Sequence, residues 1–370
     1  MFCESAESPF AAPDPEANWV ELAETLSLRF AERAAEHDRA TTLPVDNLRL
    51  LHQEGFDTAW LPRDQGGHDL SWRTFGEVLT AIARGCPSTA TIWLMHMGAA
   101  YGLIAQTDDD FFAGELRAGK RFANALSEPA SGNRFLMPGQ HAVPTEGGYR
   151  LDGAKRFVSG CEIAEYFLVN ALVDDKPAFF GITVDASMEF TPIWDSMGLR
   201  ATRSQLVTFN GTLLPDERRG IGSRGAINPI PVGLAFLSIG VAEAAMRALT
   251  AHARGRRIPG EDVQLSEMQW VRFAAAEAHV RLRSARLLAG QLAWLADRGS
   301  PQVNQVGFEA KLLANEVAKE VAALGVKIGG GTGFLAQSPI QRHFRDAQAG
   351  ALMAYSVEVC QSEIGALLMS

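Results

Sequence analysis

The chain has 370 residues, of which 47% are hydrophobic and 21% are charged, and its formal net charge is -9. A chain of this length has enough apolar residues for two or three compact units with large cores. The negative charge argues against a nucleic-acid partner, and the absence of an 18-residue apolar run argues against a membrane span. The first 18 residues are acidic and proline-rich, which is not typical of an export signal, and the four cysteines have neither disulfide nor metal-ligand spacing. We therefore expect a cytoplasmic protein without a metal site.

The first third of the chain is predicted to be helical. Apolar residues recur at helical spacing over residues 19–36 and again over 45–54. A loop rich in Gly, Pro and Asp follows, and Ser71 is a suitable N-cap for a helix over residues 72–84. A further helix is expected over residues 89–105. Together these segments predict a bundle of helices.

His96 lies within the last of these helices, among Ala, Met and Gly residues. It is either a core histidine with both ring nitrogens hydrogen-bonded, or a polar group that faces a bound ligand. In the second case it could act as an acid or a base, because histidine titrates near neutral pH. The position four residues further on is an alanine, so we expect no metal ligation here.

The middle of the chain changes to strand-forming sequence at Phe122. A small-residue strand leads into Ser127-Glu128-Pro129, where the proline ends regular pairing. Glu146-Gly147-Gly148 and Asp152-Gly153 are both typical of hairpin turns between alternating runs. A later strand ends at Pro215. We therefore predict a β module with helices on both sides of it in the sequence.

From about residue 230 the composition shifts to Ala, Leu, Glu and Arg, with long runs of period 3.6. We expect four antiparallel helices with short loops, typical of a helix bundle, over residues 234–254, 266–298, 309–324 and 345–368. A glycine-rich run, residues 329–333, lies between the third and the fourth. Such a run lets backbone amides approach a pyrophosphate closely.

These segments together resemble the acyl-CoA dehydrogenase family of flavoproteins. SEPASGN and DGAKRFVSG are similar to the family's T-E-P-x-x-G-S and G-x-K-x-x-I-T patterns, and MGLRATRS, GGTGF and RDA match further patterns in the same order. The resemblance implies an α+β fold. Its parts would be an N-terminal α-helical domain (1–121), a central β-barrel-like domain (122–229) and a C-terminal four-helix bundle (230–370).

The resemblance also implies an FAD cofactor. In the family, one hydroxyl from each of the first two patterns bonds the edge of the isoalloxazine ring, and these positions are Ser127 and Ser159. Phe157 stands where an aromatic residue lies against the ring. The glycine-rich segment of the family comes from a neighbouring subunit, so a homodimer or homotetramer is implied. The remaining cofactor positions implied by the resemblance are Arg256, Lys327, Gly330, Gly331 and Ser356.

The family uses a glutamate to abstract the substrate's α-proton, and the matching position here is Ala354, which cannot accept a proton. The remaining candidates for a catalytic role are Glu358, Tyr355 and His96. Glu358 lies four residues after Ala354, on the same face of the helix expected over 345–368.

Three functions stay open. The first is FAD-dependent α,β-dehydrogenation of an acyl thioester, bound to CoA or to a carrier protein, with hydride transfer to flavin N5 and an electron-transfer partner. The second is a two-component flavin-dependent monooxygenase of the same fold, which uses O2 and reduced FMN or FAD supplied by a flavin reductase, with His96 and Ser159 near the reactive oxygen. The third is a catalytically degenerate flavin-binding protein.

Overall fold

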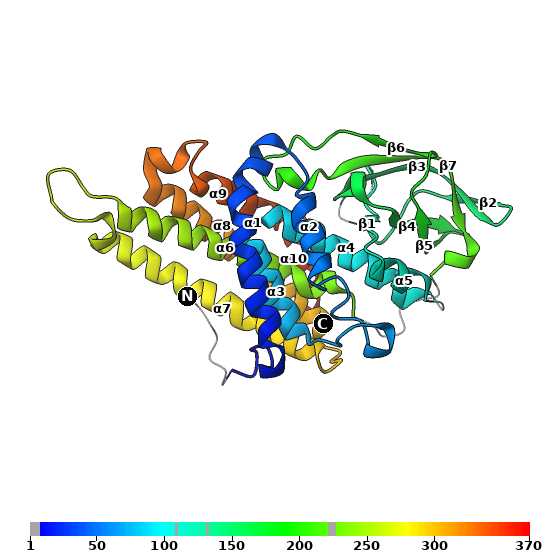
Figure 1. The fold of residues 1–370 in the computed structure, drawn as a ribbon, viewed down its shortest axis with the longest axis horizontal. Helices are drawn as coiled ribbons and strands as arrows, with labels where there is room; N and C mark the ends of the chain where they lie inside the picture. Colours follow the sequence, from blue (N-terminus) through cyan, green and yellow to red (C-terminus); the bar gives the residue numbers. More distant parts are fainter. Residues whose placement is uncertain (1–7, 108–109, 131, 133, 221–226) are drawn as a thin grey trace.

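Helices form both ends of the chain and strands form its middle (Figure 1). The computed structural model describes residues 8–107, 110–130, 132, 134–220 and 227–370, so the first seven residues of the acidic N-terminal segment lie outside the described residues. The order of helices, strands and helices confirms the predicted α+β fold.

The N-terminal helices follow the predicted pattern closely. Ser71 caps the third of them, because its side chain accepts a hydrogen bond from the Thr74 N–H at 3.2 Å. The cap satisfies one of the backbone donors that a helix leaves unpaired at its start. The helices are α1 (Ala17–Ala40), α2 (Val45–Gln53), α3 (Trp72–Gly85), α4 (Pro87–Gln106) and α5 (Phe111–Arg117).

The described strands form two sheets that face each other across a shared apolar core. The first has the order β1-β4-β5, with β1 and β4 parallel, and the second has the antiparallel order β2-β3-β7-β6. The strands are β1 (Phe122–Ala125), β2 (Ala142–Thr145), β3 (Gly148–Val158), β4 (Tyr166–Val173), β5 (Lys176–Thr183), β6 (Met188–Thr191) and β7 (Gln205–Pro215).

One of the two predicted hairpin turns is present and the other is not. β2 and β3 pair on either side of residues 146–147, as predicted. Asp152-Gly153 does not form a turn: it lies inside β3, where the pairing with β7 shifts register between Leu151 and Gly153. The Asp152 carboxylate accepts a hydrogen bond from the Gly211 N–H of β7 at 2.7 Å. Asp152-Gly153 therefore forms a β-bulge, and β3 continues beyond it.

The C-terminal helices differ from the prediction in one important place. Ala354 and Tyr355 adopt positive φ angles of 20° and 24°, and Ser356 then caps a new helix. The single helix predicted over residues 345–368 is therefore wrong, because the backbone leaves the α region between its two halves. The helices are α6 (Pro229–Gly255), α7 (Gln269–Ala296), α8 (Val303–Phe334), α9 (Pro339–Ala349) and α10 (Val357–Met369).

Helices from both ends of the chain share one hydrophobic core. Phe75 and Trp93 of the N-terminal helices belong to the same buried cluster as Phe236 of α6. At the crossing of α3 and α6, a Cβ at Gly76 would lie 2.4 Å from the Phe236 ring, so only glycine fits there. The predicted boundaries at residues 121 and 229 fall between α5 and β1 and at the start of α6, and the division into three domains stays a prediction.

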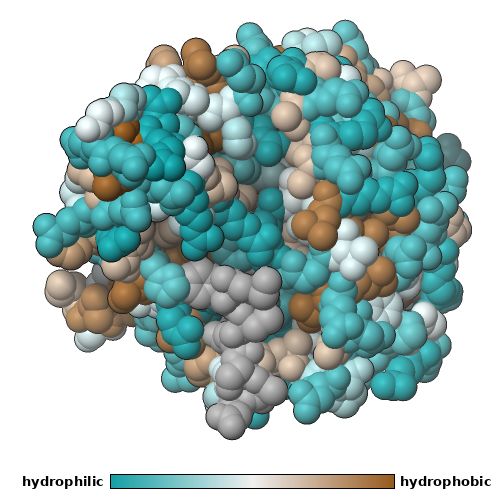
Figure 2. All heavy atoms as spheres, turned by 60° about the vertical axis from the view of Figure 1, so that its left-hand side comes forward, coloured by the Kyte–Doolittle hydropathy of each residue, from teal (hydrophilic) through white to brown (hydrophobic). Residues whose placement is uncertain are grey.

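One helix, α6, is long and apolar enough to cross a bilayer, but 89% of its most apolar window is buried inside the protein. Its apolar surface is therefore used for packing. The face of the molecule in Figure 2 is mostly hydrophilic, with hydrophobic residues in small groups. Small scattered groups of this kind are normal for a water-exposed surface.

A buried ion pair links the segment after β1 to β3. Lys155 Nζ lies 2.7 Å from Glu128 Oε1 and 2.9 Å from Asn170 Oδ1, and the Lys155 side chain is fully buried. The Glu128 carboxylate also accepts the backbone N–H groups of Gly139 and Gln140, at 2.9 and 3.3 Å. The Glu128 carboxylate therefore holds the backbone near its turn as well as the lysine.

Replacing Lys155 with methionine is expected to lower the free energy of unfolding by about 3–5 kcal/mol, because it leaves the Glu128 carboxylate buried without its cation. The measurement is urea unfolding followed by circular dichroism. Lys176→Met removes an exposed lysine from the same β region and serves as the control. Equal stability of the two variants would contradict this account of the ion pair.

Candidate active site

A cavity of about 500 Å³ lies where the β sheets meet the helices. Its wall combines the ends of β1 and β3, the segment before β7, the middle of α4, the start of α6, and the end of α9 with the linker to α10. The polar residues that line it are Thr91, Asn124, Ser127, Arg156, Ser159, Ser196, Thr202, Ser204, Arg345, Gln348 and Tyr355.

Ser127 and Ser159, predicted from two separate motifs, both line this cavity. The Arg156 N–H donates to the Ser127 carbonyl oxygen at 2.7 Å, which joins the two segments directly. A second register shift, between Lys155 and Val158, places Phe157 at a φ of 60°. This bulge turns the end of β3 toward the cavity, and bulges of this kind commonly re-aim side chains next to active sites.

Two aromatic side chains form an apolar wall beside these hydroxyls. The Phe157 ring, which is 49% exposed, meets the Trp194 ring edge-to-face, with centroids 6.0 Å apart. Both residues line the cavity. A planar heteroaromatic ring requires such an apolar wall together with a few polar groups at its edge. The residues present therefore fit a flavin.

A chain of hydrogen bonds runs from Ser159 along the wall of the cavity to Asp346 of α9. The Ser159 and Ser204 hydroxyl oxygens are 2.8 Å apart, as are those of Ser204 and Thr202. Thr202 then donates to the Leu199 carbonyl oxygen at 2.9 Å, and the Leu199 N–H donates to Asp346 at 2.8 Å. Burial raises the pKa of Asp346 to about 6. The chain orients the Ser159 hydroxyl through groups that are themselves held in place.

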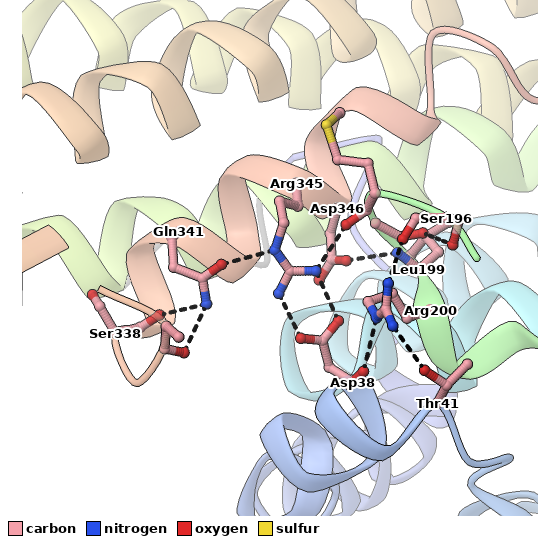
Figure 3. Close-up of polar contacts among 12 residues, drawn as sticks. Asp38, Thr41, Ser196, Leu199, Arg200, Ser338, Gln341, Arg345 and Asp346 are labelled. Atoms are coloured by element: carbon pink, nitrogen blue, oxygen red, sulfur yellow. Dashed lines mark hydrogen bonds and ion pairs between the residues drawn. The ribbon is translucent and has the colours of Figure 1, made fainter. Parts of the chain in front are cut away.

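Arg345 of α9 fixes the same segment from the other side (Figure 3). Its guanidinium donates to both carboxylate oxygens of Asp38 in α1, at 3.0 and 2.5 Å, and to the Met197 carbonyl oxygen at 2.8 Å. A Cβ at Gly198 would lie 2.2 Å from the Arg345 carbonyl oxygen, so glycine is required for this close approach. Three distant parts of the chain thus meet at residues 197–199.

The part of the cavity nearest the α9–α10 linker is apolar and aromatic. Met95, Phe135 and Met353 line it. The Tyr355 ring packs edge-to-face against Phe135 and Phe308, with centroids 5.2 and 5.4 Å apart. Burial raises the pKa of Tyr355, so its phenol remains a hydrogen-bond donor at neutral pH. Tyr355 is the one catalytic candidate of the three that lines the cavity described here.

The structure places the other two catalytic candidates elsewhere. His96 Nδ1 accepts the Phe122 N–H at 3.0 Å, and its Nε2 lies 3.6 Å from a carboxylate oxygen of Asp57. Because Nδ1 accepts this hydrogen bond and burial lowers the pKa of His96, the ring is neutral and joins α4 to β1 as a core histidine, but only Nδ1 and not Nε2 is hydrogen-bonded among the described residues. Glu358 is exposed in the first turn of α10. The inference that it shares a helix face with Ala354 is wrong, because that helix begins at residue 357.

Most of the remaining cofactor positions do not reach this cavity. Arg256, Lys327, Gly330 and Gly331 are exposed and are not among its lining residues. The end of α6 that carries Arg256 lies at the opposite side of the molecule from the sheets (Figure 1). Ser356 is buried as the N-cap of α10. Cofactor roles for these residues stay predictions.

Several lining residues were not predicted from the sequence, among them Arg156, Trp194 and Ser204. Arg156 directly precedes the predicted Phe157, and strict strand alternation would place the two side chains on opposite faces. The bulge at the end of β3 removes that alternation, so pattern alone could not find Arg156. Ser204 is the last residue of the MGLRATRS segment, which contributed to the resemblance. That motif could have identified Ser204 as a lining residue.

Comparison with known proteins points to one family. The family models for the acyl-CoA dehydrogenase N-terminal domain and C-terminal domain match residues 20–109 and 225–366. The mitochondrial short-chain specific acyl-CoA dehydrogenase of Sus scrofa is 26% identical over 359 residues, which cover 89% of this chain and 86% of that protein.

Solved structures share the whole fold. Butyryl-CoA dehydrogenase from Megasphaera elsdenii superposes with a TM-score of 0.89 at 21% identity, and the match covers 100% of both chains. Dibenzothiophene monooxygenase TdsC from Paenibacillus superposes with a TM-score of 0.84 at 20% identity, over 95% of this chain and 97% of that one. At these identities the likeness establishes the fold.

Ser127→Ala and Ser159→Ala are each expected to weaken FAD binding about 2- to 12-fold, the range for one neutral hydrogen bond of ~0.5–1.5 kcal/mol. The measurement is titration of the apoprotein with FAD, followed by flavin fluorescence. Ser159→Thr keeps the hydroxyl and should retain affinity. Thr145→Ala, at an exposed position on β2, is the control, and a loss there as large as at Ser127 would speak against the assignment.

Proposed function

Because the chain belongs to the acyl-CoA dehydrogenase superfamily, we propose that it is an FAD-dependent oxidoreductase that removes hydrogen from the α and β carbons of an acyl thioester. The observation that supports this most is the convergence of Ser127 and Ser159 on one cavity beside the wall of Phe157 and Trp194. When bound, the flavin would supply the hydride acceptor.

We assign the following roles to the protein's own residues. Ser127 and Ser159 hydrogen-bond the edge of the ring, and the hydrogen-bond chain to Asp346 keeps Ser159 oriented. The apolar end of the cavity, formed by Met95, Phe135 and Met353, takes the acyl group and excludes water. The Tyr355 hydroxyl, kept protonated by burial, donates a hydrogen bond to a substrate oxygen.

The α-proton has no evident acceptor among the described lining residues. None of them is an aspartate or glutamate, and Ala354 lies where the family carries its base. General bases commonly contribute about 10²–10⁴-fold to such reactions. This absence favours a second candidate, because a monooxygenase reaction does not begin with loss of an α-proton. The second candidate is a two-component monooxygenase that uses O2 and reduced FMN or FAD from a flavin reductase.

One experiment separates the candidates. The purified protein is reconstituted with FAD, and its visible spectrum is followed without oxygen after an acyl thioester is added. Bleaching of the flavin band supports the dehydrogenase. Oxygen consumption only when a flavin reductase supplies reduced flavin supports the monooxygenase. If FAD binds and neither reaction occurs, the chain is a flavin-binding protein without turnover, and the enzymatic proposal fails.

Ala354→Glu is expected to raise the rate of anaerobic bleaching by an acyl thioester about 100-fold or more, because it provides a carboxylate at the edge of the cavity. Stopped-flow absorbance at equal flavin content measures this rate. Ala354→Gln has the same size without the base and is the control. If the glutamate variant were no faster than the glutamine variant, the α-proton would not be accepted at this position.

We also propose that the chain works as a homo-oligomer, with an electron-transfer partner and in the cytoplasm. Phe273, Val280 and Leu287 lie seven residues apart on α7 and are 66%, 61% and 39% exposed. This spacing places them in one stripe, typical of a helix that packs against another helix. The exposed segment at Lys327 and Gly330 would then be available to a second copy's cofactor.

Phe273→Asp is expected to shift the protein toward the monomer, because it places a charge within that stripe. Light scattering after size-exclusion chromatography measures the mass. Leu28→Asp makes the same change at a residue of α1 that is 68% exposed. An unchanged mass for Phe273→Asp, or an equal effect of Leu28→Asp, would contradict an interface at α7.

A further inference from the structure

Arg156 brings a positive charge to the cavity that none of the described residues neutralises. Its backbone is tied to Ser127, and its guanidinium carbon lies 4.7 Å from the centre of the Phe157 ring. The residue lines the cavity beside both of these neighbours. Its Nε atom is buried and has no hydrogen-bond partner among the described residues.

The other cations in this region are paired. Arg345 binds both carboxylate oxygens of Asp38, and Lys155 binds Glu128. No ion pair within 4.0 Å involves Arg156 in the described part of the chain, and none of the described lining residues is acidic. Arg156 is half-buried, and removing an unpaired charge even partly from water is unfavourable, a cost that is offset when an anion occupies the site.

A bound flavin in its reduced form is an anion that fits this position. The oxidised ring is neutral, whereas the two-electron reduced ring carries a negative charge spread over its pyrimidine part. A protein tunes the electronics of a flavin through charges placed near the ring. Arg156 contacts both the residue that would bond the ring edge, through its backbone, and the aromatic side chain that would lie against the ring, through its guanidinium.

We propose that Arg156 binds the reduced, anionic flavin more tightly than the oxidised flavin, and thereby increases the electron affinity of this site. The proposal rests on the proposed flavin site, but not on the identity of the substrate. It applies equally to a dehydrogenase, which must accept electrons from substrate, and to a monooxygenase, which must capture reduced flavin from a reductase.

The test compares the dissociation constants of oxidised and reduced FAD, measured anaerobically by fluorescence titration. In Arg156→Gln the ratio of oxidised to reduced constants should fall about 10-fold or more, which corresponds to a decrease of roughly 30 mV in the two-electron potential. Arg156→Lys keeps the charge and should keep most of the ratio. Arg150→Gln, at an exposed position on the same strand, should leave the ratio unchanged.

The outcomes are distinct. If the wild-type chain binds neither form of FAD, this inference and the proposed function both fail. If FAD binds but Arg156→Gln leaves the ratio unchanged, the inference alone fails. A change confined to the KM of an acyl thioester would also overturn it, because the anion bound by Arg156 would then belong to the substrate. The inference is supported if Arg156→Gln lowers the ratio of oxidised to reduced dissociation constants while its dissociation constant for oxidised FAD stays within about 3-fold of wild type. The second condition excludes general misfolding.

Discussion

The cavity depends on one buried ionic contact, between Lys155 and Glu128. Each residue is next to a group that the site requires: Glu128 follows Ser127, and Lys155 precedes Arg156 and Phe157. Because the Lys155 side chain is fully buried, breaking the pair would leave unpaired charges away from water, which is strongly unfavourable. The contact therefore holds the end of β1 and the end of β3 in a fixed relation, and the backbone bond from Arg156 to Ser127 adds to it.

Around this contact, elements far apart in the sequence complete the wall. α1 supplies Asp38, the segment before β7 supplies Met197 and Leu199, and α9 supplies Arg345 and Asp346 (Figure 3). These groups meet by charge-assisted hydrogen bonds, which are stronger and more directional than neutral ones. The proposed substrate side is different, because it is built from Met95, Phe135, Met353 and Tyr355 and carries no described carboxylate. The proposed flavin side thus combines an aromatic wall with hydrogen-bonding groups, whereas the other side is mainly apolar and aromatic.

This division has a consequence for the chemistry. With no described carboxylate next to the proposed substrate position, the site has a weak acceptor for a proton, whereas Arg156, without an ion pair among the described residues, favours negative charge on the proposed cofactor side. Both features favour transfer of electrons to the proposed flavin over removal of a proton from the substrate. The same fold also occurs in a monooxygenase, TdsC, in keeping with the general rule that function is decided by the site rather than by the fold.

The sequence by itself determined the order of helical and strand regions, the cap at Ser71, the hydroxyl positions at residues 127 and 159, and the superfamily. These features depend on local periodicity, on turn residues or on short motifs, and so they are readable along the chain. Only the tertiary structure decided that Asp152-Gly153 bulges rather than turns, that the helix expected over 345–368 is interrupted, and that His96 belongs to the core. It also decided that Arg156 enters the cavity. In each case the outcome depends on partners distant in sequence, such as β7 for the bulge and Phe122 for His96, and the free energy of those contacts is not encoded in local pattern.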